Sequence, residues 1–99
     1  MDEVSTITVT PDEVAEKVIE VVKQLSGKET ITPEMRVFED VGFDHLDLVE
    51  CIMEMEETLS DMVTYSVFIT NEDCDRVDTV DDLIKVSMTA LNISKEFAK

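Results

Sequence analysis

Apolar residues recur along most of the chain at spacings of three and four, the period of an α-helix. The first such stretch has Thr10 as a cap, Pro11 in the first helical position and Glu13 three residues after the cap, which is the pattern of a capping box. Gly27 is placed to end the helix. We therefore predict a helix over residues 11–25. Its apolar stripe consists of Val14, Val18, Val21, Val22 and Leu25.

A long connection follows, over residues 26–43. It is too apolar for a solvated linker, and a loop of this length with its own hydrophobic anchors is usually functional or tightly docked. We expect it to pack on the helices. The anchors are Met35, Val37, Phe38 and Val41.

The next helix is predicted to begin after Asp44 as its cap, with Asp47 adding negative charge where the helix dipole favours it. It carries two apolar sets. The first set is Leu48, Cys51, Ile52, Met55 and Leu59. The second set is Leu46, Val49 and Met53, with Glu50, Glu54 and Glu57 beside it. One set can fill the core, and the other is either a contact surface or is buried by further helices. We expect Met53 to be exposed and Met55 to be buried.

Residues 60–70 are rich in β-branched and aromatic side chains, which favours a strand that could pair with the N-terminal residues. Alternatively, these residues could form an extended loop that packs against the helices, and this is the interpretation we favour. Asn71 can cap a short helix through about Arg76, and Thr79 can cap a last helix that ends near Asn92. The inward stripe of the last helix is Val80, Leu83, Ile84, Ser87, Met88 and Leu91.

These elements predict an all-α fold, a bundle of three main helices and one short helix with a long loop after the first. Residues 1–9 are expected to be a flexible tail, residues 10–93 the bundle and residues 94–99 a frayed end. The 99 residues fit one small domain, and we expect a monomer.

A formal net charge of −16 sets the electrostatic character of the chain. Such a surface repels nucleic-acid phosphates and anionic lipids, so we expect no nucleic acid and no membrane as partners, but it attracts basic patches on proteins. Plain solubility is the other explanation. Cys51 and Cys74 form no C-x-x-C pair, which favours a reduced, cytoplasmic protein. No nucleophile–base arrangement or metal-ligand spacing accompanies the single histidine, His45, so we expect no enzyme and no metal site.

Two blocks of sequence point to a known family. Residues 38–44 (FEDVGFD) are similar to the F-x-E-D-L-G-x-D approach of acyl carrier proteins, and residues 46–50 (LDLVE) are similar to its L-D-x-V-E continuation. Residues 69–77 and 78–80 (DTV) resemble the short third helix and the start of the last helix. The resemblance runs from about Asp12 to Leu91. It implies the carrier four-helix bundle, a phosphopantetheine arm that carries acyl groups as thioesters, and a place in fatty acid biosynthesis.

The chain departs from this family pattern at the attachment site. His45 stands where the modified serine is expected, and no Ser or Thr lies between Phe43 and Cys51. Attachment needs a hydroxyl oxygen, which imidazole does not offer, so no arm is expected unless residue 45 were serine. The histidine could be natural or engineered. About six extra residues also lie between Leu59 and Ile69, beside the cleft that shelters the acyl chain in the family.

Three functions remain open. The first is a carrier-like interaction module or an unmodifiable carrier variant that docks on basic patches of acyl-chain synthases and of the phosphopantetheinyl transferase. The second is an acidic inhibitor or nucleic-acid mimic that binds a basic protein, and the third is a structural module. The predicted partner-binding residues of the first are Asp44, Leu46, Asp47, Val49, Glu50, Met53, Glu54 and Glu57.

Overall fold

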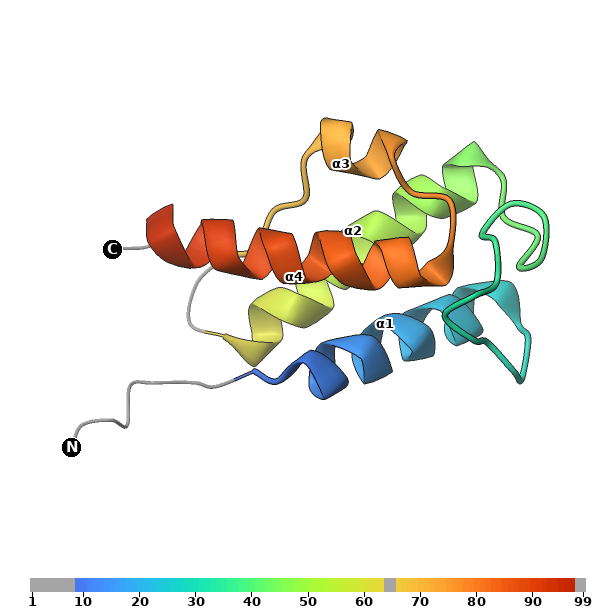
Figure 1. Ribbon diagram of the computed structural model, residues 1–99, viewed down its shortest axis with the longest axis horizontal. Coiled ribbons are helices and arrows are strands. Elements are labelled where there is room, and N and C mark those ends of the chain that lie inside the picture. Colours follow the sequence, from blue (N-terminus) through green and yellow to red (C-terminus); the bar gives the residue numbers. More distant parts are fainter. Residues whose placement is uncertain (1–8, 64–65, 98–99) are drawn as a thin grey trace.

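The protein is a bundle of four helices (Figure 1). The computed structural model describes residues 9–63 and 66–97, with side chains up to Asn92. In chain order the helices are α1 (Pro11–Ser26), α2 (His45–Met62), α3 (Asn71–Asp75) and α4 (Val80–Phe97). Within the described residues the only β pairing is one isolated bridge between Arg36 and Thr79. The all-α prediction is confirmed.

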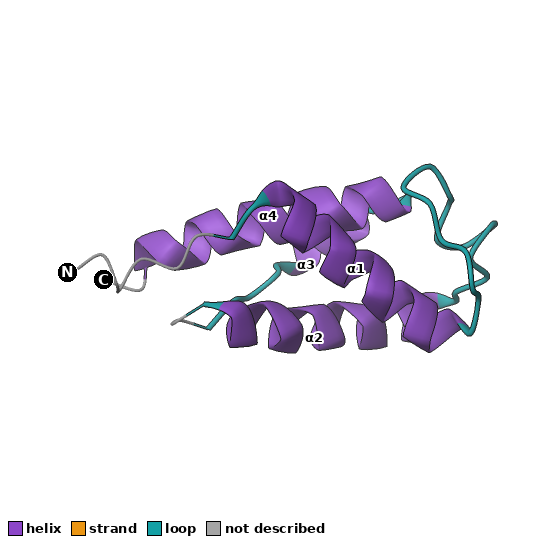
Figure 2. Ribbon diagram, turned by 90° about the horizontal axis from the view of Figure 1, so that it is seen from below, coloured by secondary structure: helices purple, strands orange, loops and turns teal. Residues whose placement is uncertain are grey.

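The three long helices contact one another in pairs. α1 runs in one direction along the bundle, and α2 and α4 return in the other, with the connection between α1 and α2 at one end (Figure 1). The view from below places α1 in front and α3 behind, so α1 and α3 lie on opposite sides of the α2–α4 pair (Figure 2). The core between them consists mainly of aliphatic side chains, which come from all three long helices and both long connections.

The predicted ends of α1 are confirmed. The Thr10 hydroxyl accepts a hydrogen bond from the Glu13 amide at 3.2 Å, and the Thr10 amide donates to the Glu13 carboxylate at 3.0 Å. Gly27 has a φ of 76°, a left-handed conformation that favours glycine, and its amide donates to the Lys23 carbonyl at 2.8 Å. The four valines of the stripe are buried, whereas Leu25, which continues the same stripe, is 42% exposed.

The connection from α1 to α2 packs on the bundle as predicted. Ile31, Val37, Val41 and Phe43 are buried in the core cluster, while Met35 is partly buried against it. Phe38 is 36% exposed, so its prediction as an anchor was wrong. Backbone hydrogen bonds tie the connection to the start of α4. They run from the Val37 amide to the Asp78 carbonyl, from the Val80 amide to the Met35 carbonyl and from the Asp81 amide to the Pro33 carbonyl, each at 2.9 Å. These hydrogen bonds hold residues 33–37 against the start of α4.

The segment over residues 60–70 was predicted as an extended loop, but its first three residues belong to α2, which runs to Met62. Residues 66–70 form no strand, which supports the loop over that part. Val67 and Ile69 are buried, and α2 holds the backbone beside them. The Val67 amide donates to the Ser60 hydroxyl and the Ile69 amide donates to the Glu56 carboxylate, both at 2.8 Å. The N-terminal residues 1–8 that were considered as a pairing partner lie outside the described residues, as do residues 64–65.

Two further helix ends differ from their predictions, besides the end of α2. The cap of α3 is Thr70 rather than Asn71, because the Thr70 hydroxyl accepts from the Asp73 amide at 3.2 Å. α4 begins after Thr79 as predicted, but it continues to Phe97 instead of ending near Asn92. No glycine or proline follows Asn92 in the sequence, so nothing in the residue types forces the helix to stop there.

The inward face of α4 also differs in part. Val80, Leu83, Ile84 and Ser87 are buried, as predicted. Met88, however, is 37% exposed, and Ala90 takes a buried position instead at 3%. The Ser87 hydroxyl, which is fully buried, donates to the Leu83 carbonyl one turn earlier at 2.8 Å, so its polar group is satisfied inside the core.

Candidate functional site

A capping box starts α2 at the end of the connection. Asp44 accepts a hydrogen bond from the Asp47 amide at 2.8 Å, and the Asp44 amide donates to the Asp47 carboxylate at 3.0 Å. The hydrogen bond from the Asp47 backbone holds the pKa of Asp44 below its ordinary value. Gly42 makes the turn into the box with a φ of 88°. These contacts fix the position of the residue that follows, His45.

His45 is the first residue of α2 and is exposed. Its ring lies against Phe38, with the ring centroids 5.3 Å apart and the planes tilted by 54°. No Ser, Thr or Tyr lies between Pro33 and Glu57 in the sequence, so no hydroxyl oxygen stands near this position along the chain. The residues at the start of α2 therefore do not fit attachment of a phosphopantetheine arm.

One face of α2 is apolar and open to solvent. Leu46 is 75% exposed, Val49 is 54% exposed and Met53 is 61% exposed. Glu50, Glu54 and Glu57 are also exposed, and these six residues are called the α2 face below. The first apolar set of α2 is buried in the core, so only one of the two sets is needed for folding. The exposure of Met53 was predicted, and the second apolar set, whose burial was left open, is exposed as a whole. Binding through this face stays a prediction.

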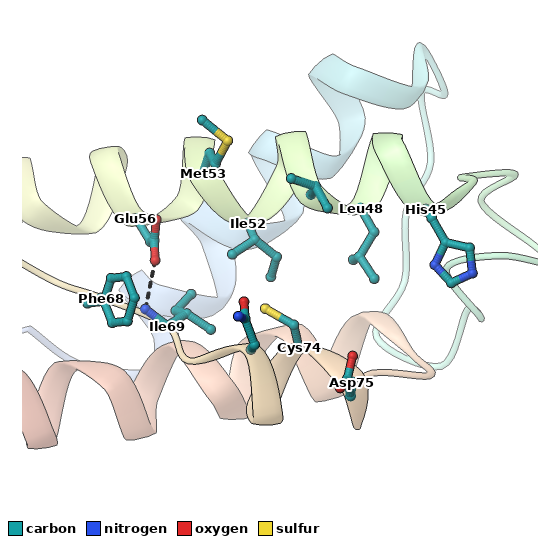
Figure 3. Close-up of a pocket in the computed structure, with 11 residues that line it drawn as sticks. His45, Leu48, Ile52, Met53, Glu56, Phe68, Ile69, Cys74 and Asp75 are labelled. Atoms are coloured by element: carbon teal, nitrogen blue, oxygen red, sulfur yellow. Dashed lines mark hydrogen bonds between the residues drawn. The ribbon is translucent and has the colours of Figure 1, made fainter.

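A cleft of about 300 Å³ opens between α2, residues 68–69 and α3. Leu48 and Ile52 point into it from α2, and Cys74 faces them from α3 (Figure 3). His45 lies at one end, and Met53 projects away from the cleft at its rim (Figure 3). The hydrogen bond from the Ile69 amide to Glu56 lies at the other end (Figure 3).

The two cysteines differ in their surroundings. Cys51 is fully buried in α2 with its sulfur 3.7 Å from that of Met55, and burial raises the pKa of its thiol to about 12. Cys74 is partly exposed in the cleft. Burial and the nearby Glu56 carboxylate raise the pKa of the Cys74 thiol above its ordinary value.

These cysteine environments predict selective alkylation. Near pH 8 the native protein is expected to gain one carbamidomethyl group from iodoacetamide, on Cys74, since Cys51 is both shielded and held as the thiol. Raising the pH should speed the reaction of Cys74, because more of its thiol is ionised, and leave Cys51 unmodified. Peptide mapping by mass spectrometry reads the site. Equal reaction of both cysteines without denaturant would contradict the burial of Cys51.

Sequence reasoning missed two exposed apolar residues near these surfaces. Phe68 is 68% exposed at the edge of the cleft. Leu25, at the end of α1, lies beside Met53 and the glutamates of α2 in a second hollow. The spacing of Leu25 matches the buried stripe, so no signal in the sequence separates it from the core residues.

Other kinds of site find no support in the part of the chain that is described. Residues 9–63 and 66–97 contain no group of three His, Cys, Asp or Glu placed to hold a metal ion. The described helices also include none with the length and apolarity needed to cross a bilayer.

Comparison with known proteins places the chain in a family. No protein-family model matches it. An acyl carrier protein of Syntrophobacter fumaroxidans is 38% identical over 69 residues, which cover 68% of this chain and 78% of that protein. The chain belongs to the acyl carrier protein family. Acyl carrier proteins are carriers and not enzymes, which agrees with the expectation that this chain is not an enzyme.

Solved structures agree with this assignment. The crystal structure of an acyl carrier protein from Thermotoga maritima superposes with a TM-score of 0.65 at 25% identity, covering 83% of this chain and 91% of that one. A protein from Mycobacterium tuberculosis assigned as an acyl carrier protein gives a TM-score of 0.62 at 23% identity, covering 81% and 96%. The second likeness shows the fold alone. The acyl-carrier bundle expected from residues 38–50 is thereby confirmed.

Proposed function

We propose that this acyl carrier protein homologue docks on basic surfaces of other proteins through the α2 face and carries no covalent arm. One observation carries the proposal. Three apolar side chains stand 54–75% exposed among three glutamates, on a helix whose first residue is His45 instead of serine. The partners we expect are acyl-chain synthases and the phosphopantetheinyl transferase. We also propose that the protein is a cytoplasmic monomer.

The α2 face combines the two features that a protein contact needs. Apolar side chains at its centre release water when a partner covers them, at roughly 25 cal/mol per Å² of apolar area. The carboxylates around them favour a positive partner surface, and the net charge of −16 speeds the encounter. Asp44 and Asp47 lie at the start of the same helix and extend the negative rim toward His45.

The absence of an arm follows from the chemistry of residue 45. Attachment would require an oxygen nucleophile to displace the phosphate of coenzyme A, and the imidazole of His45 offers only nitrogen. A phosphohistidine linkage is labile in comparison. Leu48 and Ile52 line a cleft beside α2, and the fold around residue 45 is that of an acyl carrier protein.

Restoring the serine tests this proposal. The His45→Ser variant is incubated with coenzyme A and a phosphopantetheinyl transferase of broad specificity, and intact mass is measured. We expect the variant to gain one phosphopantetheine and the unchanged chain to gain none, because only residue 45 is changed while the α2 face is kept.

A matched His45→Ala variant is the control, since it removes the imidazole without supplying a hydroxyl. It should stay unmodified. A phosphopantetheine adduct on the unchanged chain would refute the claim that no arm is carried. Failure of the His45→Ser variant to react, with far-UV circular dichroism showing an intact bundle, would refute docking of the transferase on α2.

A further inference from the structure

The cleft between α2 and α3 is mostly apolar along its walls but carries a carboxylate at one end. Leu48, Ile52 and Ile69 line it with aliphatic side chains. At the end away from His45 stands Glu56, whose carboxylate accepts the hydrogen bond from the Ile69 amide at 2.8 Å (Figure 3). The volume of about 300 Å³ lies at the lower limit of small-molecule sites, which span roughly 300–1,000 Å³. The cleft is therefore large enough for one short hydrocarbon chain.

Glu56 is a partly buried carboxylate with no cation beside it. The ion pairs formed among the described side chains join other groups, and none of them includes Glu56. No lysine or arginine belongs to the lining of the cleft. A carboxylate can accept about four hydrogen bonds, and the Ile69 amide supplies one. Because partial burial removes water from this charge, a cation that binds here also offsets the desolvation of Glu56.

An aromatic ring lies at the same end of the cleft as this carboxylate. Phe68 directly precedes Ile69, lines the cleft and is 68% exposed (Figure 3). Aromatic faces attract cations through their negative π-electron density. The charge of Glu56 also acts inside the cleft. Burial is the largest cause that raises the pKa of the Cys74 thiol above its ordinary value, and the Glu56 carboxylate is the second. One cavity thus combines hydrocarbon walls with two groups that favour positive charge.

We propose that this cleft binds a free primary alkylammonium ion, with the ammonium group at Glu56 and Phe68 and the hydrocarbon chain along Ile52 and Leu48. One of the three N–H donors of the ammonium group can form a charge-assisted hydrogen bond with the carboxylate. The net charge of −16 attracts such a cation to the protein. The ligand differs from the acyl chain that the family resemblance implies, because it is cationic, is not covalently attached and has its polar group at the end of the cleft opposite residue 45.

Other classes of ligand fit this cleft less well. An anionic amphiphile could reach the imidazole of His45 only beside the carboxylates of Asp44 and Asp47, which form the capping box of α2. A neutral chain would cover Glu56 without pairing its charge, which is costly. A metal ion finds no group of three His, Cys, Asp or Glu placed to hold it in the part of the chain that the structure describes. The alkylammonium ion matches both the apolar walls and the charge.

A titration with three probes of equal chain length tests the proposal. Octylammonium, 1-octanol and octanoate are each added to the ¹⁵N-labelled full chain at pH 7 and physiological salt, below the concentration at which micelles form. We expect saturable amide shifts centred on Ile69 and Cys74 with octylammonium, roughly tenfold weaker binding of 1-octanol and still weaker binding of octanoate. Equal affinity for octylammonium and 1-octanol, tighter binding of octanoate, or no shift at millimolar octylammonium would each overturn the proposal.

A matched pair of variants separates the cleft from general attraction to an acidic surface. Glu56→Gln removes the charge but keeps a carbonyl oxygen that can accept from the Ile69 amide. Its affinity for octylammonium should fall roughly tenfold, and its affinity for 1-octanol should stay unchanged. Glu16→Gln makes the same change in net charge at an exposed position on α1 outside the cleft and should leave both affinities unchanged. Equal losses of octylammonium binding in the two variants would refute the site.

Phe68→Leu tests the contribution of the aromatic ring. Phe68 is exposed, so the variant is expected to fold, and leucine keeps an apolar side chain at the edge of the cleft. The affinity for octylammonium should fall several-fold, while that for 1-octanol changes little. An unchanged affinity for octylammonium would contradict the placement of the ammonium group at this end. None of these outcomes depends on docking through the α2 face, which modification of the His45→Ser variant measures separately.

Discussion

Replacing Met55 with alanine is expected to lower the free energy of unfolding by about 3 kcal/mol, within the range of 2–5 kcal/mol measured for such changes in protein cores. Met55 is 1% exposed and its sulfur lies 3.7 Å from that of Cys51. Met55 lies where α2 faces α1, so the substitution leaves a cavity at the contact between these two helices. Small domains are stable by only about 5–15 kcal/mol, so this is a large share. Urea unfolding followed by circular dichroism measures the loss.

Met53→Ala is the matched control, since it makes the same change two residues earlier on the same helix. Met53 is 61% exposed, and we expect its loss to alter stability by no more than about 0.5 kcal/mol. The two variants thus distinguish a methionine that stabilises the fold from one that lies on the exposed α2 face. Equal destabilisation by both variants would show that α2 does not divide into a buried and an open apolar set.

The parts of this structure that the sequence predicts are those decided within a few residues. Thr10 and Glu13 form the predicted capping box through contacts three residues apart. Asp44 is the predicted cap of α2, while the return hydrogen bond to the Asp47 carboxylate is seen only in the structure. The buried set of α2 is also readable, because its members share one helical stripe. The family resemblance added the order of the elements, which the comparisons confirm.

The exposure of Leu25 could not be predicted from the sequence. Its position continues the buried stripe of α1, and within one helix nothing distinguishes it from Val21. Whether it is covered depends on how far α2 extends beside the last turn of α1, a property of the packed bundle. The result is an exposed residue beside Met53, and the hollow that it helps to form could not be predicted from either helix alone.

The conformation of the segment after α2 likewise depends on contacts with residues distant in the sequence. Its β-branched residues favour extended backbone, and residues 66–70 are indeed outside the helices. Whether this segment forms a loop or a strand depends on which acceptor each of its backbone amides donates to. The Val67 and Ile69 amides donate to the Ser60 and Glu56 side chains of α2, so no neighbouring strand is needed to satisfy them.

Reversing two charges on α2 should nearly abolish docking. In the His45→Ser background, which reports docking as a rate of modification, the Glu50→Lys and Glu54→Lys double variant is expected to lower kcat/KM of the transferase roughly ten- to a hundredfold. Both glutamates are exposed and lie beside Met53 on the α2 face. Lysine there would meet the positive surface of the enzyme with like charge and remove two attractive contacts.

The control is a Glu16→Lys and Glu20→Lys double variant on α1, which changes the net charge by the same amount at exposed positions outside the α2 face. It should slow modification only slightly, because separated charges on the surface are screened within about 8 Å at physiological salt. The same comparison decides between the proposed docking and the acidic-mimic alternative. A nucleic-acid mimic spreads its contacts over many carboxylates. If both double variants lose the same amount of affinity for a basic protein that binds the chain, the mimic is favoured and a defined binding face on α2 is contradicted.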